Sequence, residues 1–195
     1  MNLCPRLWFV PRAQKLKPKG VTVSAMLAKA CGMVLENHPI VNAAYDASGA
    51  IKYNEKINVA MAVALDGGLI TPTIQEANLK DIYTVSRDWK DLVAKAKAKT
   101  LSPAEYNSGT FVISNLGMFG VQQFDAILPV GMGAILAISA SLPAVVSQPN
   151  GHFGVQKQMT VTITCDHRHI YGADAANFLK DLAELMENDV DSLLF

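Results

Sequence analysis

The stretch QMTVTITC at residues 158–165 and its continuation DHRHIYGADAANFLKDLAELMEND at residues 166–189 decide the fold. In the first part, apolar side chains alternate with threonines, which is typical of a β-strand with one buried face. From about Asp174 to Asn188, apolar residues recur at intervals of three and four, which predicts an amphipathic helix. A short polar turn joins the two elements. We therefore expect a strand that ends in this turn, followed by a helix.

The rest of the chain mixes helical and strand patterns without a regular β-α-β alternation. The expected elements, in chain order, are a helix over 21–37, a strand over 54–65, a helix over 79–99, the start of another helix at 102–105, and strands over 110–115 and 134–140. A turn at 66–68 follows the first strand, and residues 1–20, which include three prolines, are expected to be irregular. This mixture predicts a mixed α/β (α+β) fold.

The composition describes one globular domain without a marked charge. The chain has 195 residues, half of them hydrophobic, and its 17 basic residues balance its 17 acidic residues. A chain of this length suits a single domain. Zero net charge provides no general attraction to nucleic acid or to an anionic membrane. The lysines of the 79–99 helix fit a solvated face, and no aromatic stacking platform accompanies them, so nucleic acid is not indicated as a partner.

Three further patterns argue against other classes of protein. The weakly polar stretch 131–146 is too short and too often interrupted to span a bilayer, so no membrane association is expected. Cys4, Cys31 and Cys165 form no CxxC pair, so the sequence predicts no zinc site and no disulfide framework, and we expect no metal. The GMG at 131–133 lies outside a strand-to-helix context and does not predict a phosphate-binding loop.

The polar turn after residue 165 holds the strongest candidate for chemistry. Asp166, His167 and Arg168 stand at the end of the strand, where a rigid element can fix a side chain that stays accessible. A histidine there can act as a general base near neutral pH, although a single histidine at a strand end more often has a structural role. Cys165 lies two residues from His167, which raises the alternative of a cysteine hydrolase. That alternative is weak because a nucleophile and its base must face each other and need a third, orienting group.

The segment 166–189 resembles the C-terminal signature of the catalytic domains of dihydrolipoamide acyltransferases, a family related to chloramphenicol acetyltransferase. The matching residues are Asp166, His167, Arg168, Gly172, Ala173, Phe178 and Leu179. Three upstream segments are similar to other parts of the family in the correct order: 16–43 to its first core helix, 57–74 to a segment lining its coenzyme A channel, and 109–140 to its Ser-Asn-Leu-Gly strand and the hairpin beyond. The resemblance implies a chloramphenicol acetyltransferase-like two-layer fold with a mixed central sheet and flanking helices.

The resemblance covers residues 16–195 as one acyltransferase core domain. Residues 1–15 are expected to form an irregular N-terminal segment that departs from the family, whose members have an additional strand and a helix start there. The lipoyl domain and the peripheral-subunit-binding domain that usually precede the core in the family have no counterpart in these 195 residues. We therefore expect the lipoyl group to be carried on a domain outside this chain.

The family implies a direct acyl transfer between dihydrolipoamide and coenzyme A, which is a substrate. His167 would remove the thiol proton as sulfur attacks the thioester, and Ser114 would donate a hydrogen bond to the oxyanion. In the family this serine comes from the neighbouring subunit, so the resemblance implies at least a homotrimer. An acetyl group is expected as the acyl group, and succinyl or branched acyl groups stay open because pocket size cannot be derived from the sequence.

The resemblance assigns two further sets of residues. Supporting roles in the loop of His167 fall to Asp166, Arg168, Tyr171 and Gly172. The substrate channel would be lined by Asp66, Gly67, Gly68, Leu69, Thr71, Asn115, Leu116 and Gly117.

Tyr171 departs from the family pattern, which has Asp or Asn four residues after the histidine. A tyrosine can hydrogen bond, but through a longer and differently aimed group. The tyrosine variant resembles the photosynthetic branch of the family, which favours the chloroplast stroma over a bacterial cytoplasm or the mitochondrial matrix.

The resemblance also implies partners. These are further copies of the chain in a core particle, lipoyl domains, and peripheral dehydrogenase components bound through domains outside this chain. The alternative is a catalytically weak or inactive structural core subunit of the same type of complex. His167 and Ser114 argue against it, whereas Tyr171 and the unusual N-terminus keep it open.

Overall fold

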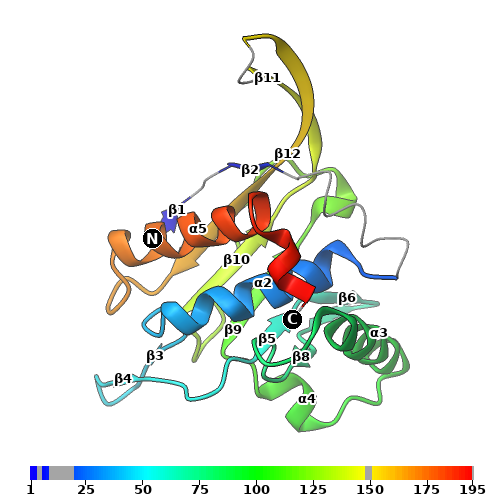
Figure 1. The fold of residues 1–195 in the computed structure, drawn as a ribbon. Coiled ribbons are helices and arrows are strands. Elements are labelled where there is room, and N and C mark those ends of the chain that lie inside the picture. The colour runs from blue at the N-terminus through cyan, green and yellow to red at the C-terminus, as the bar shows by residue number, and fades with distance from the viewer. Residues whose placement is uncertain (4–5, 9–19, 148–150, 195) are drawn as a thin grey trace.

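A computed structural model describes residues 1–3, 6–8, 20–147 and 151–194. Its centre is a mixed β-sheet whose neighbouring strands follow the order β1-β12-β10-β9-β5-β8. Two helices, α2 (Val23–Asn37) and α5 (Gly172–Glu187), contact each other and cover one face of this sheet (Figure 1). The predicted two-layer, mixed α/β architecture is confirmed.

The sheet contains both parallel and antiparallel neighbours. Its strands are β1 (Asn2–Leu3), β12 (Phe153–Cys165), β10 (Ala134–Ile138), β9 (Phe111–Asn115), β5 (Val59–Met61) and β8 (Thr73–Ile74). Strand β9 runs parallel to both β10 and β5, whereas β12 is antiparallel to β10 and to β1. The long β12 therefore extends through the sheet and brings the turn after Cys165 to one end of it.

Several shorter strands pair outside the central strand order. Strand β11 (Leu142–Ser147) pairs with the first half of β12, and the two project from the body as a hairpin (Figure 1). Strand β2 (Arg6–Trp8) pairs with residues 158–160 in the middle of β12. Two isolated hairpins complete the set: β3 (Ala44–Tyr45) with β4 (Ile51–Lys52), and β6 (Val63–Leu65) with β7 (Gly68–Ile70).

The helices begin where the sequence provides capping groups. Thr22 caps α2 by accepting a hydrogen bond from the Ala25 backbone, and Asp81 caps α3 (Ile82–Ala98) by accepting from two backbone N–H groups. The short α4 (Pro103–Asn107) opens with a capping box between Ser102 and Glu105, as the sequence predicts. Two 3-10 helices follow, η2 (Gly117–Phe119) and η3 (Val190–Leu194). None of the helices in the described ranges is long and apolar enough to cross a membrane.

Helix α2 is buried on almost every side because it lies between the sheet, α3 and α5. Its small residues make this possible. A Cβ added at Gly32 would lie 2.9 Å from the backbone nitrogen of Asn78, so the helix and the 77–78 segment meet there backbone to backbone.

Three expectations need correction. The N-terminal segment is not irregular at Asn2–Leu3 and Arg6–Trp8, which form strands, whereas residues 4–5 and 9–19 lie outside the described part of the chain. These strands are too short to carry an alternating pattern, and their order comes from pairing with β12. The predicted strand over 54–65 is in fact two strands, β5 and β6, and residues 54–58 belong to neither.

The β11–β12 hairpin is the third difference. The sequence predicts a strand from residue 158, but β12 begins at Phe153 and β11 precedes it. Most side chains of the hairpin are exposed or half-buried, including Val145 and Val155, so burial imposes no alternation on this part of the sequence.

Candidate functional site

The turn that follows β12 is held by its own backbone. The N–H of Asp166 donates to the carbonyl of Gly133 at 2.9 Å, and the N–H groups of His169 and Ile170 donate to the carbonyl of Asp166 at 3.3 and 3.0 Å. His167 lies at the exposed side of this turn, and its ring meets the ring of Tyr171 edge-on, with 5.9 Å between centroids. The turn thus presents an accessible imidazole on a fixed backbone.

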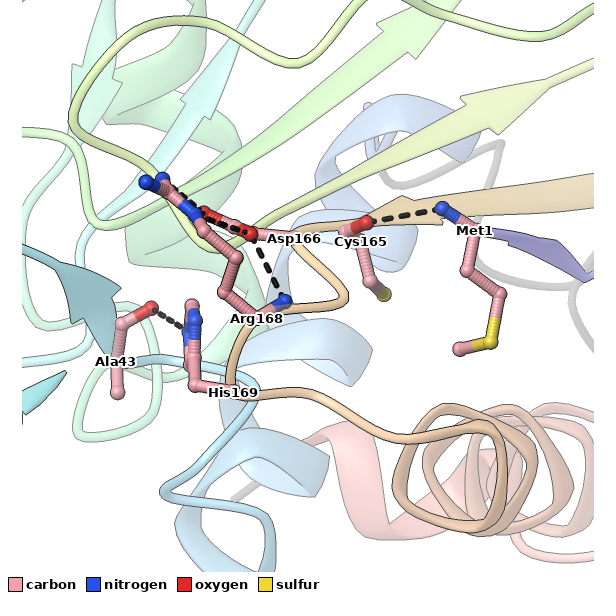
Figure 2. A network of polar contacts seen from close by, with 6 residues as sticks. All are labelled: Met1, Ala43, Cys165, Asp166, Arg168 and His169. Carbon is pink, nitrogen blue, oxygen red and sulfur yellow. Dashed lines mark hydrogen bonds and ion pairs between the residues drawn. The ribbon is translucent and has the colours of Figure 1, made fainter.

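Arg168 and Asp166, the two neighbours of His167 in the sequence, form a close ion pair with each other (Figure 2). The Nε of Arg168 lies 2.9 and 3.0 Å from the two carboxylate oxygens, and its backbone N–H donates to the same carboxylate. These hydrogen bonds from Arg168 hold the pKa of Asp166 below its ordinary value, although partial burial opposes them. An ionised Asp166 therefore secures the turn through Arg168.

Tyr171 and Gly172 begin helix α5. The backbone N–H of Tyr171 donates to the carboxylate of Asp174 at 2.9 Å, so Tyr171 occupies the N-cap position and Gly172 is the first helical residue. The side chain of Tyr171 is 62% exposed. Its packing on the His167 ring is the interaction that the tyrosine provides at this position.

Ser114 lies far from His167 within one chain. On β10, Ala137 is paired with Ser114 of β9, whereas Ala134 is paired with Cys165 of β12. Three residues along a strand span about 10 Å, and His167 lies a further two residues beyond Cys165. The structure therefore places the two proposed catalytic side chains towards opposite ends of β10, the strand that lies between β9 and β12.

A cavity of about 590 Å³ lies beside Ser114. Four of the predicted residues line it together: Leu69, Ser114, Asn115 and Leu116. The other predicted channel residues, Asp66, Gly67, Gly68, Thr71 and Gly117, are not on its wall. Gly67 has a φ of 82° and forms the tip of the β6–β7 hairpin, as the predicted turn requires.

The end of β9 is tied to the start of α2. The side-chain amide of Asn115 donates to the hydroxyl of Ser24 at 3.3 Å, and its carbonyl oxygen accepts from the N–H of Gly117 at 2.9 Å. A Cβ at Gly117 would lie 2.9 Å from the carbonyl oxygen of Ser139, so only glycine lets the chain turn this closely. Asn115 thus lines the wall next to Ser114, and its hydrogen bond with Gly117 fixes the turn that follows β9.

Sequence reasoning missed the contribution of two helices to this cavity. Thr22 and Ser24 line it from the start of α2, and Trp89, Val93 and Lys97 line it from α3. The apolar face of α3 was visible as a periodic pattern, but periodicity does not distinguish a face against the core from a face along a cavity.

Comparison with known proteins assigns the chain to a family. Residues 10–194 match the family model described as 2-oxoacid dehydrogenases acyltransferase (catalytic domain). The chain belongs to this acyltransferase family. This covers nearly the whole sequence, including part of the N-terminal segment expected to depart from the family.

Relatives of this acyltransferase domain include component 4 of the chloroplastic pyruvate dehydrogenase complex of Arabidopsis thaliana, a dihydrolipoyllysine-residue acetyltransferase. It is 56% identical over 92% of this chain, but that span is only 37% of the relative. The chain therefore spans less than half the length of such relatives.

Solved structures agree with this assignment. The cubic core of a pyruvate dehydrogenase multienzyme complex superposes with a TM-score of 0.90 at 28% identity, over all of this chain and 84% of that one. The dihydrolipoamide acetyltransferase of Azotobacter vinelandii gives 0.90 at 27% over the same shares, and its study concerned a serine, a histidine and an asparagine in catalysis. A chloramphenicol acetyltransferase, with a TM-score of 0.65 at 14% identity over 96% of this chain and 88% of that one, shares the fold.

The thiol of Cys165 in this acyltransferase domain is unsuited to a nucleophilic role. Its side chain is 3% exposed, and burial raises its pKa to about 12. A thiol of this kind is protonated at neutral pH. The cysteine hydrolase alternative therefore loses its nucleophile. Cys31 is likewise buried, and Cys4 lies outside the described residues.

Across residues 1–3, 6–8, 20–147 and 151–194, no three histidine, cysteine, aspartate or glutamate side chains gather as they would around a metal ion.

Proposed function

We propose that this domain transfers an acetyl group between S-acetyldihydrolipoamide and coenzyme A, with His167 as the general base. The observation that carries the proposal is the turn after β12, which holds an accessible imidazole on a backbone fixed by the Asp166–Arg168 pair. Family membership and the acetyltransferase relatives support the acyl group and the two thiols.

The reaction is a direct exchange between thioesters. His167 takes the proton of the attacking thiol, and the sulfur forms a bond to the carbonyl carbon of the bound thioester. The resulting tetrahedral oxyanion accepts a hydrogen bond from the hydroxyl of Ser114. When the intermediate collapses, the bond to the departing sulfur breaks, and the protonated His167 returns the proton to that sulfur.

The separation of Ser114 and His167 means that a site containing both needs two copies of the chain. His167 of one copy would face Ser114 of the next, which requires an oligomer. Exposed apolar side chains on the projecting hairpin support such an assembly, since Val145, Phe153 and Val155 are each at least 71% exposed in one copy. We infer a homotrimer as the catalytic unit and a larger core particle built from it.

The cavity beside Ser114 is the proposed place of a substrate thiol and its arm. Apolar side chains such as Met61, Trp89 and Val93 form much of its wall, while Ser114 and Asn115 supply polar groups at one end. Such a wall suits a long, weakly polar arm that ends in a reactive sulfur. The pantetheine arm of coenzyme A is of this kind, and the lipoyl group would arrive on a separate domain.

Tyr171 takes the place of the amide or carboxylate that the family has at this position. In the Azotobacter vinelandii enzyme the asparagine follows the histidine by four residues, which is the spacing of His167 and Tyr171. We infer that the tyrosine ring orients His167 by edge-on packing rather than through a hydrogen bond.

The proposed setting is the core of a plastid pyruvate dehydrogenase complex. Two Arabidopsis thaliana relatives at 56% identity are described as chloroplastic. We accordingly propose the chloroplast stroma as the location, with lipoyl domains and peripheral dehydrogenase components as partners.

The test is acetyl transfer from acetyl-CoA to free dihydrolipoamide by the wild type, His167→Ala and Cys165→Ala. General-base catalysis contributes about 10²- to 10⁴-fold, so His167→Ala should lose at least about a hundredfold in kcat at unchanged oligomeric mass. Cys165→Ala should retain transfer. A correctly assembled wild type without activity would instead support the inactive structural subunit. Loss of transfer activity in Cys165→Ala but not in His167→Ala would support the cysteine hydrolase alternative.

A further inference from the structure

We propose that Tyr45, on the β3–β4 hairpin, is a positioning residue for His167. It does not touch the reacting groups. Its ring is the common surface on which Arg168 and His169, the two residues that follow His167, both rest. The inference depends on the proposed function, because a positioning effect is measurable only where His167 acts in catalysis.

The first contact is between Tyr45 and Arg168. The guanidinium carbon of Arg168 lies 4.1 Å from the centroid of the Tyr45 ring, within the range of a cation–π interaction. The same guanidinium holds both oxygens of the Asp166 carboxylate. Tyr45 therefore limits the movement of the whole Asp166–Arg168 pair.

The second contact is between Tyr45 and His169. The two rings stack with an interplanar angle of 22° and 6.2 Å between centroids. His169 is almost completely buried, and its Nε2 donates to the carbonyl oxygen of Ala43 at 3.2 Å, since a carbonyl can only accept (Figure 2). The segment 43–45 thus holds the far side of the turn both through its backbone and through its ring.

A third segment closes this arrangement. A Cβ at Gly133 would lie 2.0 Å from the carbonyl oxygen of Ala43, so no side chain fits between them. The carbonyl of Gly133 in turn accepts from the N–H of Asp166. Gly133 therefore lies directly between the 43–45 segment and the turn of His167, and the close approach to Ala43 accounts for the glycine at this position.

His167 depends on this support. Its side chain is exposed and its ring meets the exposed ring of Tyr171, so the position of the imidazole depends on the backbone of the turn that carries it. Arg168 and His169 fix that backbone, and both rest on Tyr45. An error of about 1 Å in the position of a catalytic group can cost up to about a hundredfold in rate.

The experiment compares Tyr45→Leu, Tyr45→Phe and the matched control Tyr53→Leu in the acetyl-transfer assay, with oligomeric mass and melting temperature measured for each. Tyr53 lies just after β4 and its side chain is 57% exposed. We expect Tyr45→Leu to lower kcat about tenfold with KM for both substrates within about twofold. Tyr45→Phe keeps the ring face and should stay within about twofold of the wild type, as should Tyr53→Leu.

Unchanged kcat in Tyr45→Leu would overturn the inference, as would an equal loss in Tyr45→Phe, an equal loss in Tyr53→Leu, or a change confined to KM. If Tyr45→Leu fails to assemble, Tyr45→Met keeps apolar volume without a ring face and should show the same loss in kcat. Full activity in His167→Ala would remove the proposed function itself. An inactive His167→Ala together with a fully active Tyr45→Leu would remove only the role of Tyr45.

Discussion

At the scale of single residues, the ion pair of Asp166 and Arg168 makes the stability of the turn depend on pH. Arg168 holds the pKa of Asp166 below the value of about 4 that it has in an unfolded chain. A carboxyl with a lowered pKa stabilises the fold at a pH above its unfolded value, and this contribution disappears as the pH falls through the folded value.

We therefore expect Asp166→Asn to lower the melting temperature relative to the wild type at pH 7, and the gap to narrow as the pH falls below about 4. Thermal unfolding between pH 7 and pH 3 measures it. Asp125→Asn, at an exposed position, is the control for the removal of one carboxylate. A gap that stays constant, or widens in acid, would contradict the assignment of the lowered pKa to Asp166.

At the scale of elements, α2 and the 77–78 segment meet too closely for any side chain at Gly32. Alanine normally stabilises a helix interior by about 1 kcal/mol relative to glycine. Here the added Cβ would meet backbone atoms of Ala77 and Asn78 at 2.9 to 3.0 Å, which a rotamer change cannot relieve. Overpacking of this kind costs about 1–3 kcal/mol and should outweigh the gain in helix propensity.

Gly32→Ala should accordingly lower the free energy of unfolding by roughly 1 kcal/mol or more, as measured by denaturant titration. Gly68→Ala provides the comparison, because a Cβ there meets nothing within 4 Å. Its stability should stay within about 0.5 kcal/mol of the wild type. Equal stability of Gly32→Ala and the wild type would mean that the 77–78 segment moves away freely.

The elements that could be predicted are those with one buried face, because such burial produces a periodic pattern of apolar residues in the sequence. The 158–165 alternation and the repeat of α5 led to β12 and α5, and the position of His167 followed from the end of the strand. Strands β1 and β11 show no such pattern, since β1 has only two residues and β11 is mostly exposed. The support of the turn by Tyr45 could not be predicted either, because its partners lie more than 120 residues away and no periodic pattern joins them.

At the scale of the whole molecule, the distance between Ser114 and His167 predicts complementation between inactive chains. His167→Ala and Ser114→Ala homo-oligomers should each be strongly impaired. When the two chains are unfolded, mixed equally and reassembled, sites that join an intact His167 from one copy to an intact Ser114 from another should form. About a quarter of the sites would then be intact if the copies mix at random.

Acetyl transfer by the mixed oligomer, compared with each variant refolded alone, measures this recovery. The double variant His167→Ala/Ser114→Ala mixed with either single variant is the control, because it supplies no missing group and should restore no activity. No recovery from a well-mixed oligomer would mean that both residues act within one copy, against the strand register that separates them.

That same register has a genetic consequence. On the proposed mechanism, a newly synthesised chain is silent until it meets its neighbours, so it cannot consume acetyl-CoA while still unassembled. Each copy in a ring contributes its histidine to one site and its serine to another. A variant chain that lacks both residues would therefore inactivate two sites, one with each neighbouring copy. In a cell that makes both chains, the loss of activity would exceed the fraction of variant chains, so the allele would act in a dominant-negative way.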